Sequence, residues 1–248
     1  MSKPKHDHGF SSKLLAWFSK HARPLPWRRT RDPYKVLVSE FMLQQTQVSR
    51  VEQFYPRFLK RFSSIEVLAR ARPKAVREAW EGLGYYARAA NLHALAKEVS
   101  GVGCRVPDTP EELIKLPGVG RYTAGAVACF AYEKAVPAVD TNVARVIRRY
   151  FLGERGAGSG QGRPTPKHRS ATTSTAPRSL LPRIWQIAES IVPKDGKRAW
   201  KFNQAMMELG ATVCVARKPK CTECPVVRDC KVGRRLDSRG AAKSHSSC

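Results

Sequence analysis

The fold is decided by residues 109–142, which read TPEELIKLPGVGRYTAGAVACFAYEKAVPAVDTN. Thr109, Pro110 and Glu112 predict the start of a helix. Threonine caps free amides, proline suits the first helical position, and the glutamate completes a capping box. That helix must end before Pro117, since proline disfavours helical geometry in the residue that precedes it. The stretch therefore opens with a short capped helix.

A hairpin is predicted at residues 116–120, LPGVG. Gly118 and Gly120 permit positive φ and a close backbone approach, and they leave the first amides of the following helix free to bind an anion. Without further context, a tight connection between two helices explains this turn equally well. Further along, Asp140 is placed to cap the next helix, which we expect at residues 143–150.

The protein is strongly basic. It carries 45 Lys and Arg residues against 20 Asp and Glu residues, a formal net charge of +25 over 248 residues. A charge of this sign attracts polyanions and speeds encounter with them. DNA, RNA and an anionic membrane surface are the candidate partners. The membrane ranks last, because no long basic amphipathic helix with an apolar face stands out.

Hydropathy predicts a protein that stays in solution. Hydrophobic residues make up 42% of the chain, and no apolar run approaches the roughly 18 residues that span a bilayer. Residues 1–9 are polar and lack the apolar segment of a secretory signal. We therefore expect no membrane association, a reducing compartment and a cytoplasmic location, on the nucleoid if the source is bacterial.

A tryptophan and several arginines stand together in residues 23–31. Apolar residues at 14–18 predict a short first helix, and the two prolines of RPLPWRR exclude helix directly after it. Trp27 beside Arg28 combines a stacking surface with a charge that binds phosphate, as in sites for single strands or flipped bases. A core position for Trp27 with solvated arginines explains the pattern equally well.

Residues 36–58 have apolar side chains at helical spacing, interrupted by Glu40 and by the polar run QQTQ at 44–47. Glu40 adjoins the apolar face, where burial favours the neutral form of a carboxyl. A solvated helix position is the alternative. Further on, residues 82–86 read GLGYY, which predicts a backbone bend with one tyrosine in the core and one free for stacking.

The amino-acid composition changes at residues 153–179, which are rich in Gly, Ser, Thr, Pro and Arg. This composition predicts a flexible insertion, because it cannot bury enough apolar surface to order itself. Helical spacing returns at 181–191 and at 200–213, where Gln204 lies off the apolar stripe. No stretch alternates like a strand. The fold class is therefore predicted to be all-α.

Four cysteines near the C-terminus have the spacing C-x6-C-x2-C-x5-C, at Cys214, Cys221, Cys224 and Cys230. Four thiolates this close in sequence can bind zinc or an iron–sulfur cluster. A zinc module usually pairs its ligands as two Cys-x2-Cys knuckles, and only one such pair is present. The asymmetry favours a cubane cluster. Of the other cysteines, Cys129 is expected in the core and Cys248 in a tail.

The order of these motifs resembles that of the helix-hairpin-helix DNA glycosylases related to endonuclease III. Within that superfamily the chain is most similar to the MutY-type adenine DNA glycosylases. The matches cover about residues 14–230 apart from the insertion. They are LPWR at 25–28, DPYKV at 32–36, SEFMLQQTQV at 39–48, WEGLGYY at 80–86 and FNQAMMELG at 202–210.

The resemblance implies two lobes with the active site in the cleft between them. A six-helix barrel with the helix-hairpin-helix would occupy residues 30–137. An iron–sulfur domain would combine residues 10–29 with 138–232 and hold a 4Fe–4S cluster on the four cysteines. The insertion at 153–179 and the tails at 1–9 and 233–248 would be flexible.

The resemblance also assigns roles to single residues. Glu40 would be the general acid that protonates adenine, Asp140 the carboxylate that stabilises the oxocarbenium ion, and Tyr122 the support for that pair. Gln45 and Tyr85 would be wedged into the base stack. The flipped adenine would be lined by Arg23, Leu25, Trp27, Arg28 and Gln204. The DNA backbone would be met by Gly118, Gly120 and Arg121.

The chemistry fits these residue types independently. Cleaving an N-glycosidic bond needs a protonated leaving base and an anion beneath a cationic sugar, so one carboxyl must be neutral and the other ionised. Two carboxyls in different environments can supply that difference. The target must also leave the duplex, which calls for a wedge and a pocket. Tyr122 stands where endonuclease III has its Schiff-base lysine, so we expect base excision without strand cleavage.

The predicted function is therefore that of a monofunctional DNA glycosylase, acting as a monomer on double-stranded DNA in base excision repair. It would remove adenine mispaired with 8-oxoguanine or guanine. A thymine or uracil mismatch glycosylase on the same scaffold is the alternative, and a non-catalytic iron–sulfur DNA-binding protein is the third. The chain ends eighteen residues after Cys230, so we expect it to lack the C-terminal domain that reads 8-oxoguanine in MutY proteins.

Overall fold

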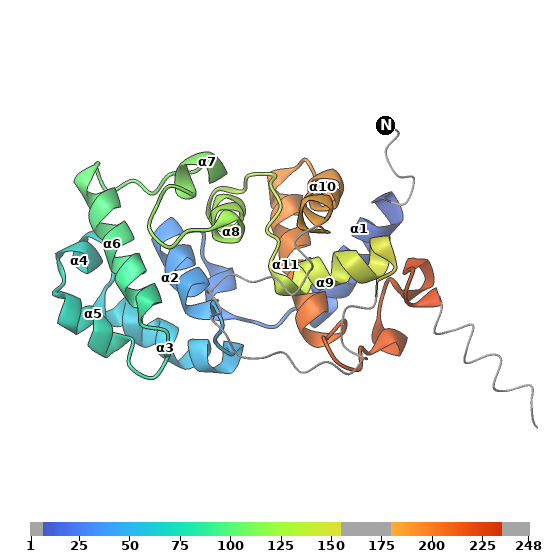
Figure 1. Cartoon of the computed structure of the whole chain (residues 1–248), viewed down its shortest axis with the longest axis horizontal. Helices are drawn as coiled ribbons and strands as arrows, with labels where there is room; N and C mark the ends of the chain where they lie inside the picture. Colours follow the sequence, from blue (N-terminus) through green and yellow to red (C-terminus); the bar gives the residue numbers. More distant parts are fainter. Residues whose placement is uncertain (1–6, 155–179, 235–248) are drawn as a thin grey trace, which may run out of the picture. The chain divides into compact units, whose positions relative to one another are not determined.

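The computed structural model describes residues 7–154 and 180–234, and all regular structure in those residues is helical (Figure 1). The all-α class is confirmed. Most of the predicted insertion and tails, and Cys248 with them, lie outside the described residues. None of the helices in residues 7–154 and 180–234 combines the length and the hydropathy of a transmembrane span.

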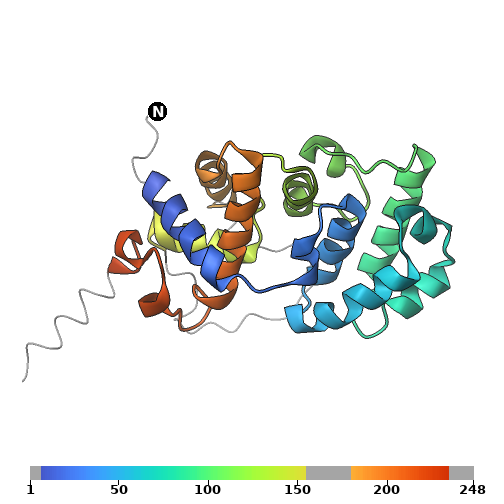
Figure 2. The same ribbon diagram turned by 180° about the vertical axis from the view of Figure 1, so that it is seen from behind.

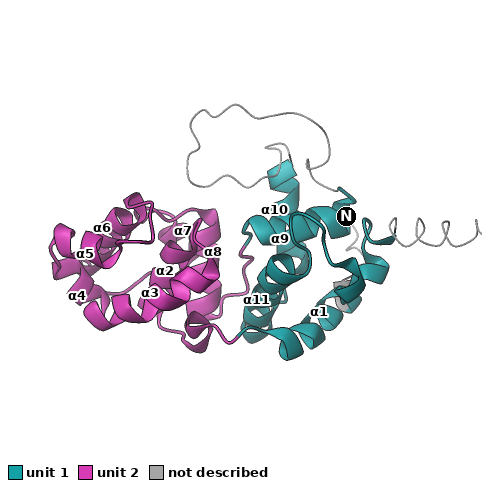
Figure 3. Cartoon of the chain, turned by 90° about the horizontal axis from the view of Figure 1, so that it is seen from below, with its two compact units in different colours: residues 1–23, 139–248 teal, residues 24–138 magenta. Residues whose placement is uncertain are grey.

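The chain folds into two compact units (Figure 3). Unit 1 combines residues 1–23 with 139–248, and unit 2 is residues 24–138. Unit 1 contains α1 (Asp7–His21), α9 (Thr141–Ile147), a π-helical turn η2 (Arg148–Leu152), α10 (Leu181–Ile191), α11 (Gly196–Thr212) and the short turns η4 (Cys221–Glu223) and η5 (Val227–Asp229). Unit 2 contains η1 (Pro26–Arg29), α2 (Pro33–Leu43), α3 (Val48–Arg61), α4 (Ile65–Arg70), α5 (Pro73–Ala79), α6 (Ala87–Gly101), α7 (Pro110–Leu113) and α8 (Arg121–Tyr132).

Helix α2 is the centre of unit 2, where it contacts η1, α3, α6 and α8. It starts where Asp32 accepts hydrogen bonds from the N–H groups of Tyr34 and Lys35, with Pro33 in the first turn. Every residue from 34 to 42 except Lys35 is buried. A helix that is apolar around nearly its whole circumference must be surrounded by other helices, which explains its position.

The helical region predicted at 36–58 is two helices rather than one. Helix α2 ends at Leu43 and α3 begins at Val48, so the polar run 44–47 forms the break. Gln45 in this run has φ +58, a left-handed conformation that no α-helix contains. The apolar spacing on either side of the break had suggested continuity, but the break reverses the chain so that α2 and α3 pack on each other.

The helix before the hairpin starts as predicted, but it is short, and the turn after it packs closely against neighbouring side chains. Thr109 Oγ1 accepts a hydrogen bond from the Glu112 N–H at 3.4 Å, and Pro110 is the first residue of α7. That helix has only 4 residues. Gly118 has φ +75, and a Cβ there would lie 2.7 Å from Asn91 and 2.9 Å from Phe41. Gly120 is the N-cap of α8, with φ −94 and nothing within 4 Å of an added Cβ. The backbone conformation and the packing therefore require glycine at position 118 but not at position 120.

The small residues of α8 let the chain that follows it pack closely against it. A Cβ on Gly125 would collide with the carbonyl oxygen of Pro137. Cys129, on the same helix, is fully buried, as expected. The residue at 125 therefore sets how closely the 137–138 segment approaches α8.

We expect Gly125→Ala to destabilise the protein by about 1–3 kcal/mol, the usual cost of overpacking a well-filled interior. Gly101→Ala is the matched control, because a Cβ at this residue, the last of α6, meets nothing within 4 Å. Urea unfolding followed by circular dichroism measures both changes. Equal, small effects of the two substitutions would contradict the close approach at Gly125.

Unit 1 is a helical cluster around one apolar core. The core includes Phe10, Leu14, Ile147, Ile184 and Phe202. Figure 2 shows α1 alongside α11, which it contacts. Helix α10 has the predicted bounds, whereas α11 starts at Gly196 rather than 200, because Asp195 caps it through the Arg198 N–H at 2.8 Å.

Candidate active site and cysteine cluster

Glu40 is a buried carboxyl in unit 2. It lies on α2 and is 4% exposed, so the alternative of a solvated helix position is wrong. The hydroxyl of Tyr122 donates a hydrogen bond to Glu40 Oε2 at 2.7 Å. Because Tyr122 is the second residue of α8, directly after the hairpin, the hairpin fixes the phenol against the carboxyl. The structure therefore brings Tyr122 to Glu40, one of the two carboxyls that it is predicted to support.

Asp140 is a half-buried carboxyl at the start of α9 in unit 1. Its Oδ1 accepts a hydrogen bond from the Val143 N–H at 2.7 Å, and its Oδ2 accepts one from Asn142 Nδ2 at 2.9 Å. The predicted capping role is therefore confirmed. Desolvation raises the pKa of the Asp140 carboxyl above its ordinary value, against the hydrogen bonds from Val143 and Asn142 and the charge of Arg145, which lower it.

Asn142 links the Asp140 carboxylate to a second set of carbonyl groups. Its side-chain oxygen accepts a hydrogen bond from Arg145 Nη2 at 2.6 Å. Arg145 also donates from Nη2 to the Gly210 carbonyl at 2.7 Å and from Nε to the Cys214 carbonyl at 2.8 Å. A chain of hydrogen bonds thus runs from Asp140 to the first of the four cysteines.

We expect Asn142→Ala to raise the pKa of Asp140 further. The substitution removes a donor whose hydrogen bond favours the ionised form of the carboxyl. Carbon-13 NMR titration of labelled aspartate carboxyls measures the shift. Thr141→Ala, at an exposed neighbour, is the control and should leave the titration unchanged. An unmoved Asp140 titration in the Asn142 variant would contradict the contact.

Arg23 is held by a glutamate that the sequence reasoning missed. Arg23 Nε donates to Glu208 Oε1 at 2.6 Å and Nη2 donates to Oε2 at 3.0 Å, a two-pronged ion pair. The side chain of Glu208 is fully buried on α11. The signal was present in the motif MELG at 207–210, where an acidic residue stands between apolar neighbours, because a buried charge is usually paired with an opposite one.

The other residues expected to line a base pocket are largely inaccessible. Leu25 is 5%, Trp27 8% and Gln204 5% exposed, and Arg28 is half-buried. The Trp27 ring packs edge-on against Tyr55, with centroids 5.6 Å apart. This packing favours the core position for Trp27 that the sequence left open. The role of these residues toward a base stays a prediction.

The two residues expected to enter a base stack are exposed. Gln45 is exposed with φ +58, and Tyr85 is 60% exposed with φ +47. Tyr86 is also exposed, at 39%, and Arg77 stacks on its ring at 5.0 Å. The expectation that one tyrosine of the pair lies in the core is therefore wrong. Arg121, which follows the hairpin, is exposed as well.

The four cysteines line one cavity in unit 1. Cys214, Cys221, Cys224 and Cys230 share this cavity with Arg149, which donates hydrogen bonds to the Cys214 sulfur at 3.4 Å and the Val215 carbonyl at 2.7 Å. Among the described residues, no three His, Cys, Asp or Glu side chains converge closely enough to hold one metal ion.

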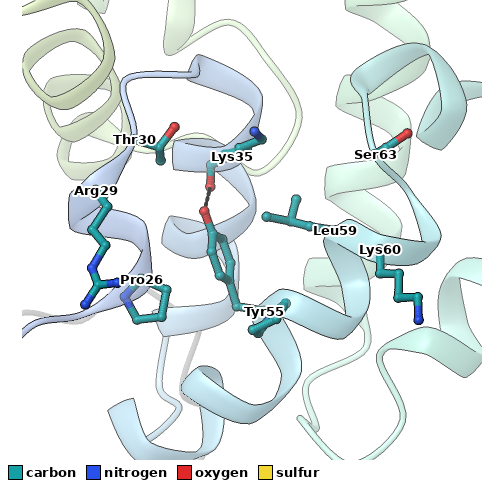
Figure 4. Close-up of a pocket in the computed structure, with 9 residues that line it drawn as sticks. Pro26, Arg29, Thr30, Lys35, Tyr55, Leu59, Lys60 and Ser63 are labelled. Atoms are coloured by element: carbon teal, nitrogen blue, oxygen red, sulfur yellow. Dashed lines mark hydrogen bonds between the residues drawn. The ribbon is translucent and has the colours of Figure 1, made fainter.

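A basic cavity of about 430 Å³ also lies in unit 2 (Figure 4). The side chains around it are those of Pro26, Arg29, Thr30, Lys35, Tyr55, Pro56, Leu59, Lys60 and Ser63. The lining contains three cations and no carboxyl, cysteine or histidine. Because it offers no acid–base pair, this cavity is not the site of the chemistry described above.

Comparison with known families identifies the class of protein. Residues 38–161, half of the chain, match the HhH-GPD superfamily of base excision DNA repair proteins. The chain belongs to this superfamily. The match begins two residues before Glu40 and extends past the hairpin and Asp140, so it contains the predicted catalytic carboxyls.

Individual relatives carry the comparison further. The chain is 38% identical over 247 residues to the adenine DNA glycosylase of Homo sapiens, covering 96% of this chain and 42% of that protein. It is 42% identical over 219 residues to the adenine DNA glycosylase of Mycolicibacterium smegmatis, covering 86% of this chain and 66% of that protein. The resemblance to MutY-type enzymes is confirmed, although the chain spans only about two-fifths of the mammalian relatives' length.

Solved structures share the fold. A thermostable thymine-DNA glycosylase aligns with a TM-score of 0.78 and 31% identity, covering 93% of this chain and 98% of that one. A trapped covalent intermediate of endonuclease III with DNA aligns with a TM-score of 0.69 and 22% identity, covering 92% of this chain and 95% of that one. The second likeness is evidence for the helix-hairpin-helix glycosylase fold alone.

Proposed function

We propose that this protein is a monofunctional DNA glycosylase that hydrolyses the N-glycosidic bond of adenine mispaired with 8-oxoguanine or guanine. The observation that carries the proposal is the buried Glu40 carboxyl with the Tyr122 hydroxyl at 2.7 Å. Glu40 lies within residues 39–48, one of the stretches in which the sequence resembles MutY-type enzymes. Burial favours the neutral form of a carboxyl, which can then donate a proton. A surface that only binds DNA would need neither a buried glutamate nor a tyrosine hydrogen-bonded to it.

The proposed reaction divides the work between two carboxyls. Glu40 delivers its proton to a ring nitrogen of the extruded adenine, and the electron pair of the C–N bond leaves with the base. The deoxyribose becomes an oxocarbenium ion, which the ionised Asp140 stabilises by its charge. Water adds to the sugar carbon and loses a proton, giving adenine and an abasic site.

Tyr122 argues for base excision without strand cleavage. Cleaving the strand through a covalent intermediate requires an amine that can form a Schiff base with the sugar. The hydroxyl of Tyr122 is instead engaged with Glu40. The proposed enzyme therefore stops at the abasic site.

One comparison favours a second candidate, the thymine or uracil mismatch glycosylase. The alignment with the structure of a thermostable thymine-DNA glycosylase includes 98% of that chain, at 31% identity. The relatives named as adenine enzymes are more similar in sequence, at 38–42% for those cited above. We therefore propose adenine as the excised base, and an assay with defined mismatches distinguishes the two candidates.

Four duplexes test the proposal, each with one pair: A opposite 8-oxoguanine, A opposite G, T opposite G, or U opposite G. Alkali then cleaves any abasic site. We expect product from the two adenine duplexes only, and no strand cleavage before alkali. Product from the thymine or uracil duplexes alone would support the second candidate. Binding without any product would leave a non-catalytic DNA-binding protein.

We expect Glu40→Gln to lower the single-turnover excision rate by about 10²–10⁴, the usual contribution of general acid–base catalysis, while duplex binding persists. Glu52→Gln is the matched control, since Glu52 is an exposed glutamate on the neighbouring α3. It should excise at the wild-type rate. Excision by the Glu40 variant at that same rate would remove Glu40 from the reaction.

The cavity lined by four cysteines supports a further part of the proposal, a bound 4Fe–4S cluster. Such a cluster is held by four cysteine thiolates, each on a different iron, so its ligands need not converge on one point. The four cysteines that line one cavity supply these ligands. When bound, the cluster would crosslink the turns that carry the cysteines to the end of α11.

We expect Cys224→Ser to lose iron and brown colour and to lower the melting temperature, because a ligand of the cluster is removed. Cys104→Ser provides the control, since Cys104 lies in unit 2, near Ser100, away from the cysteine cavity. Iron content, the visible spectrum and thermal melting are measured on both variants. A colourless wild-type protein containing zinc would refute the iron–sulfur assignment.

Duplex DNA is the proposed partner, bound by a monomer. The net charge of +25 attracts phosphates, and the amides after the hairpin offer an anion site at the start of α8, a helix of 12 residues. The exposed Arg121 adds a charge at the same place. These features support backbone contacts that hold the duplex while a base leaves it.

A further inference from the structure

Arg88 is a buried arginine between two loops of unit 2. It is the second residue of α6 and is 5% exposed. One loop, residues 43–47, carries Gln45. The other, residues 82–86, carries Tyr85. Both residues are exposed and both have positive φ, +58 and +47. Such conformations are unfavourable for residues other than glycine, and they persist only where the surroundings hold them.

The Gln45 loop is tied to Arg88 through the end of α2. Arg88 Nη1 donates hydrogen bonds to the carbonyls of Phe41 at 3.0 Å, Met42 at 2.7 Å and Gln44 at 2.5 Å, and Nη2 donates to Thr46 Oγ1 at 3.0 Å. The last carbonyls of a helix lack partners within the helix and carry negative partial charge. The guanidinium therefore ends α2 and starts the turn.

The Tyr85 loop is tied to the same group. Arg88 Nη2 donates to the carbonyls of Leu83 at 3.2 Å and Gly84 at 3.1 Å. The Trp80 indole also donates to the Gly84 carbonyl, at 3.2 Å. The guanidinium carbon lies 5.5 Å from the Trp80 ring centre and 5.6 Å from that of Tyr85. One side chain thus fixes the backbone of this loop and contacts the ring that the loop presents.

Arg88 has no acidic partner among the described residues, and its Nε–H makes no hydrogen bond. Its burial is offset by carbonyl dipoles and aromatic faces instead of an ion pair. Its six acceptors comprise two carbonyls at the end of α2, two groups of the 43–47 loop and two carbonyls of the 82–86 loop. A planar fork with two terminal nitrogens can serve both sides at once, whereas a lysine offers a single nitrogen with three donors.

We propose that Arg88 is a positioning residue that locks both loops together, so that Gln45 and Tyr85 enter a duplex as one rigid wedge. This inference rests on the proposed function, because it assigns the wedge to the opening of a base pair. Extruding a base costs unstacking energy. Two exposed side chains on mobile loops would move aside instead of displacing the base. Arg88 would thus act on base extrusion and not on the bond-breaking step.

The test uses the whole protein with Glu40→Gln to prevent turnover, and a duplex with 2-aminopurine beside the target adenine. The fluorescence of this probe rises when its neighbour unstacks. We expect the rise with Glu40→Gln alone and at least a tenfold smaller rise with Glu40→Gln/Arg88→Lys, while binding by anisotropy stays within threefold. Arg61→Lys is the matched control. Arg61 is exposed and has one acceptor among the described residues, Glu78, and its variant should keep the full rise.

Hydrogen exchange separates positioning from general core packing. In Arg88→Lys we expect faster amide exchange in both loops, 43–47 and 82–86, and unchanged exchange in α8. Faster exchange throughout unit 2 would make Arg88 an ordinary core residue and overturn the proposal. So would a full fluorescence rise with Arg88→Lys in place.

A milder variant covers the case in which Arg88→Lys does not fold. Thr46→Val removes one of the six acceptors and keeps the side-chain shape, so we expect a smaller fluorescence rise and faster exchange in 43–47 alone. If the protein with an intact Arg88 neither excises nor unstacks any base, the proposed function fails. The exchange measurement then still decides whether Arg88 couples the loops.

Discussion

The hydrogen bond from Tyr122 to Glu40 is the contact on which the proposed chemistry depends. It joins α2, the most buried helix of its unit, to the first turn of α8, so the position of the phenol is set by the hairpin before it. Gly118 makes this placement possible, because a Cβ there would push against Phe41, the neighbour of Glu40. In the proposed function the hairpin would therefore have two roles: it would offer amides to a DNA phosphate and it would hold Tyr122 against the general acid.

The second carboxyl is built by different means. Desolvation raises the pKa of Asp140, while hydrogen bonds from the Val143 N–H and the Asn142 side chain favour its ionised form. Glu40 meets a neutral hydroxyl at one oxygen and lies in a nearly closed interior. The proposed reaction assigns the acid to Glu40 and the anion to Asp140, and each carboxyl belongs to its own compact unit.

Local signals in the sequence predicted what depends on local physics. The Thr109 cap, the Asp140 cap and the bounds of α10 follow from side chains within a few positions of each element. The break between α2 and α3 did not follow, because its left-handed turn is held by Arg88, more than forty positions away. Glu208 was missed for the same reason, since its partner Arg23 lies 185 positions distant.

The most direct test is a crystal structure of the Glu40→Gln variant with a duplex that carries adenine opposite 8-oxoguanine. The account predicts an adenine turned out of the stack, with the side chain at position 40 within hydrogen-bond reach of a ring nitrogen and the Asp140 carboxylate beside the sugar of the same nucleotide. An adenine that remains stacked, or that is turned out with either side chain beyond reach of its nucleotide, would contradict it.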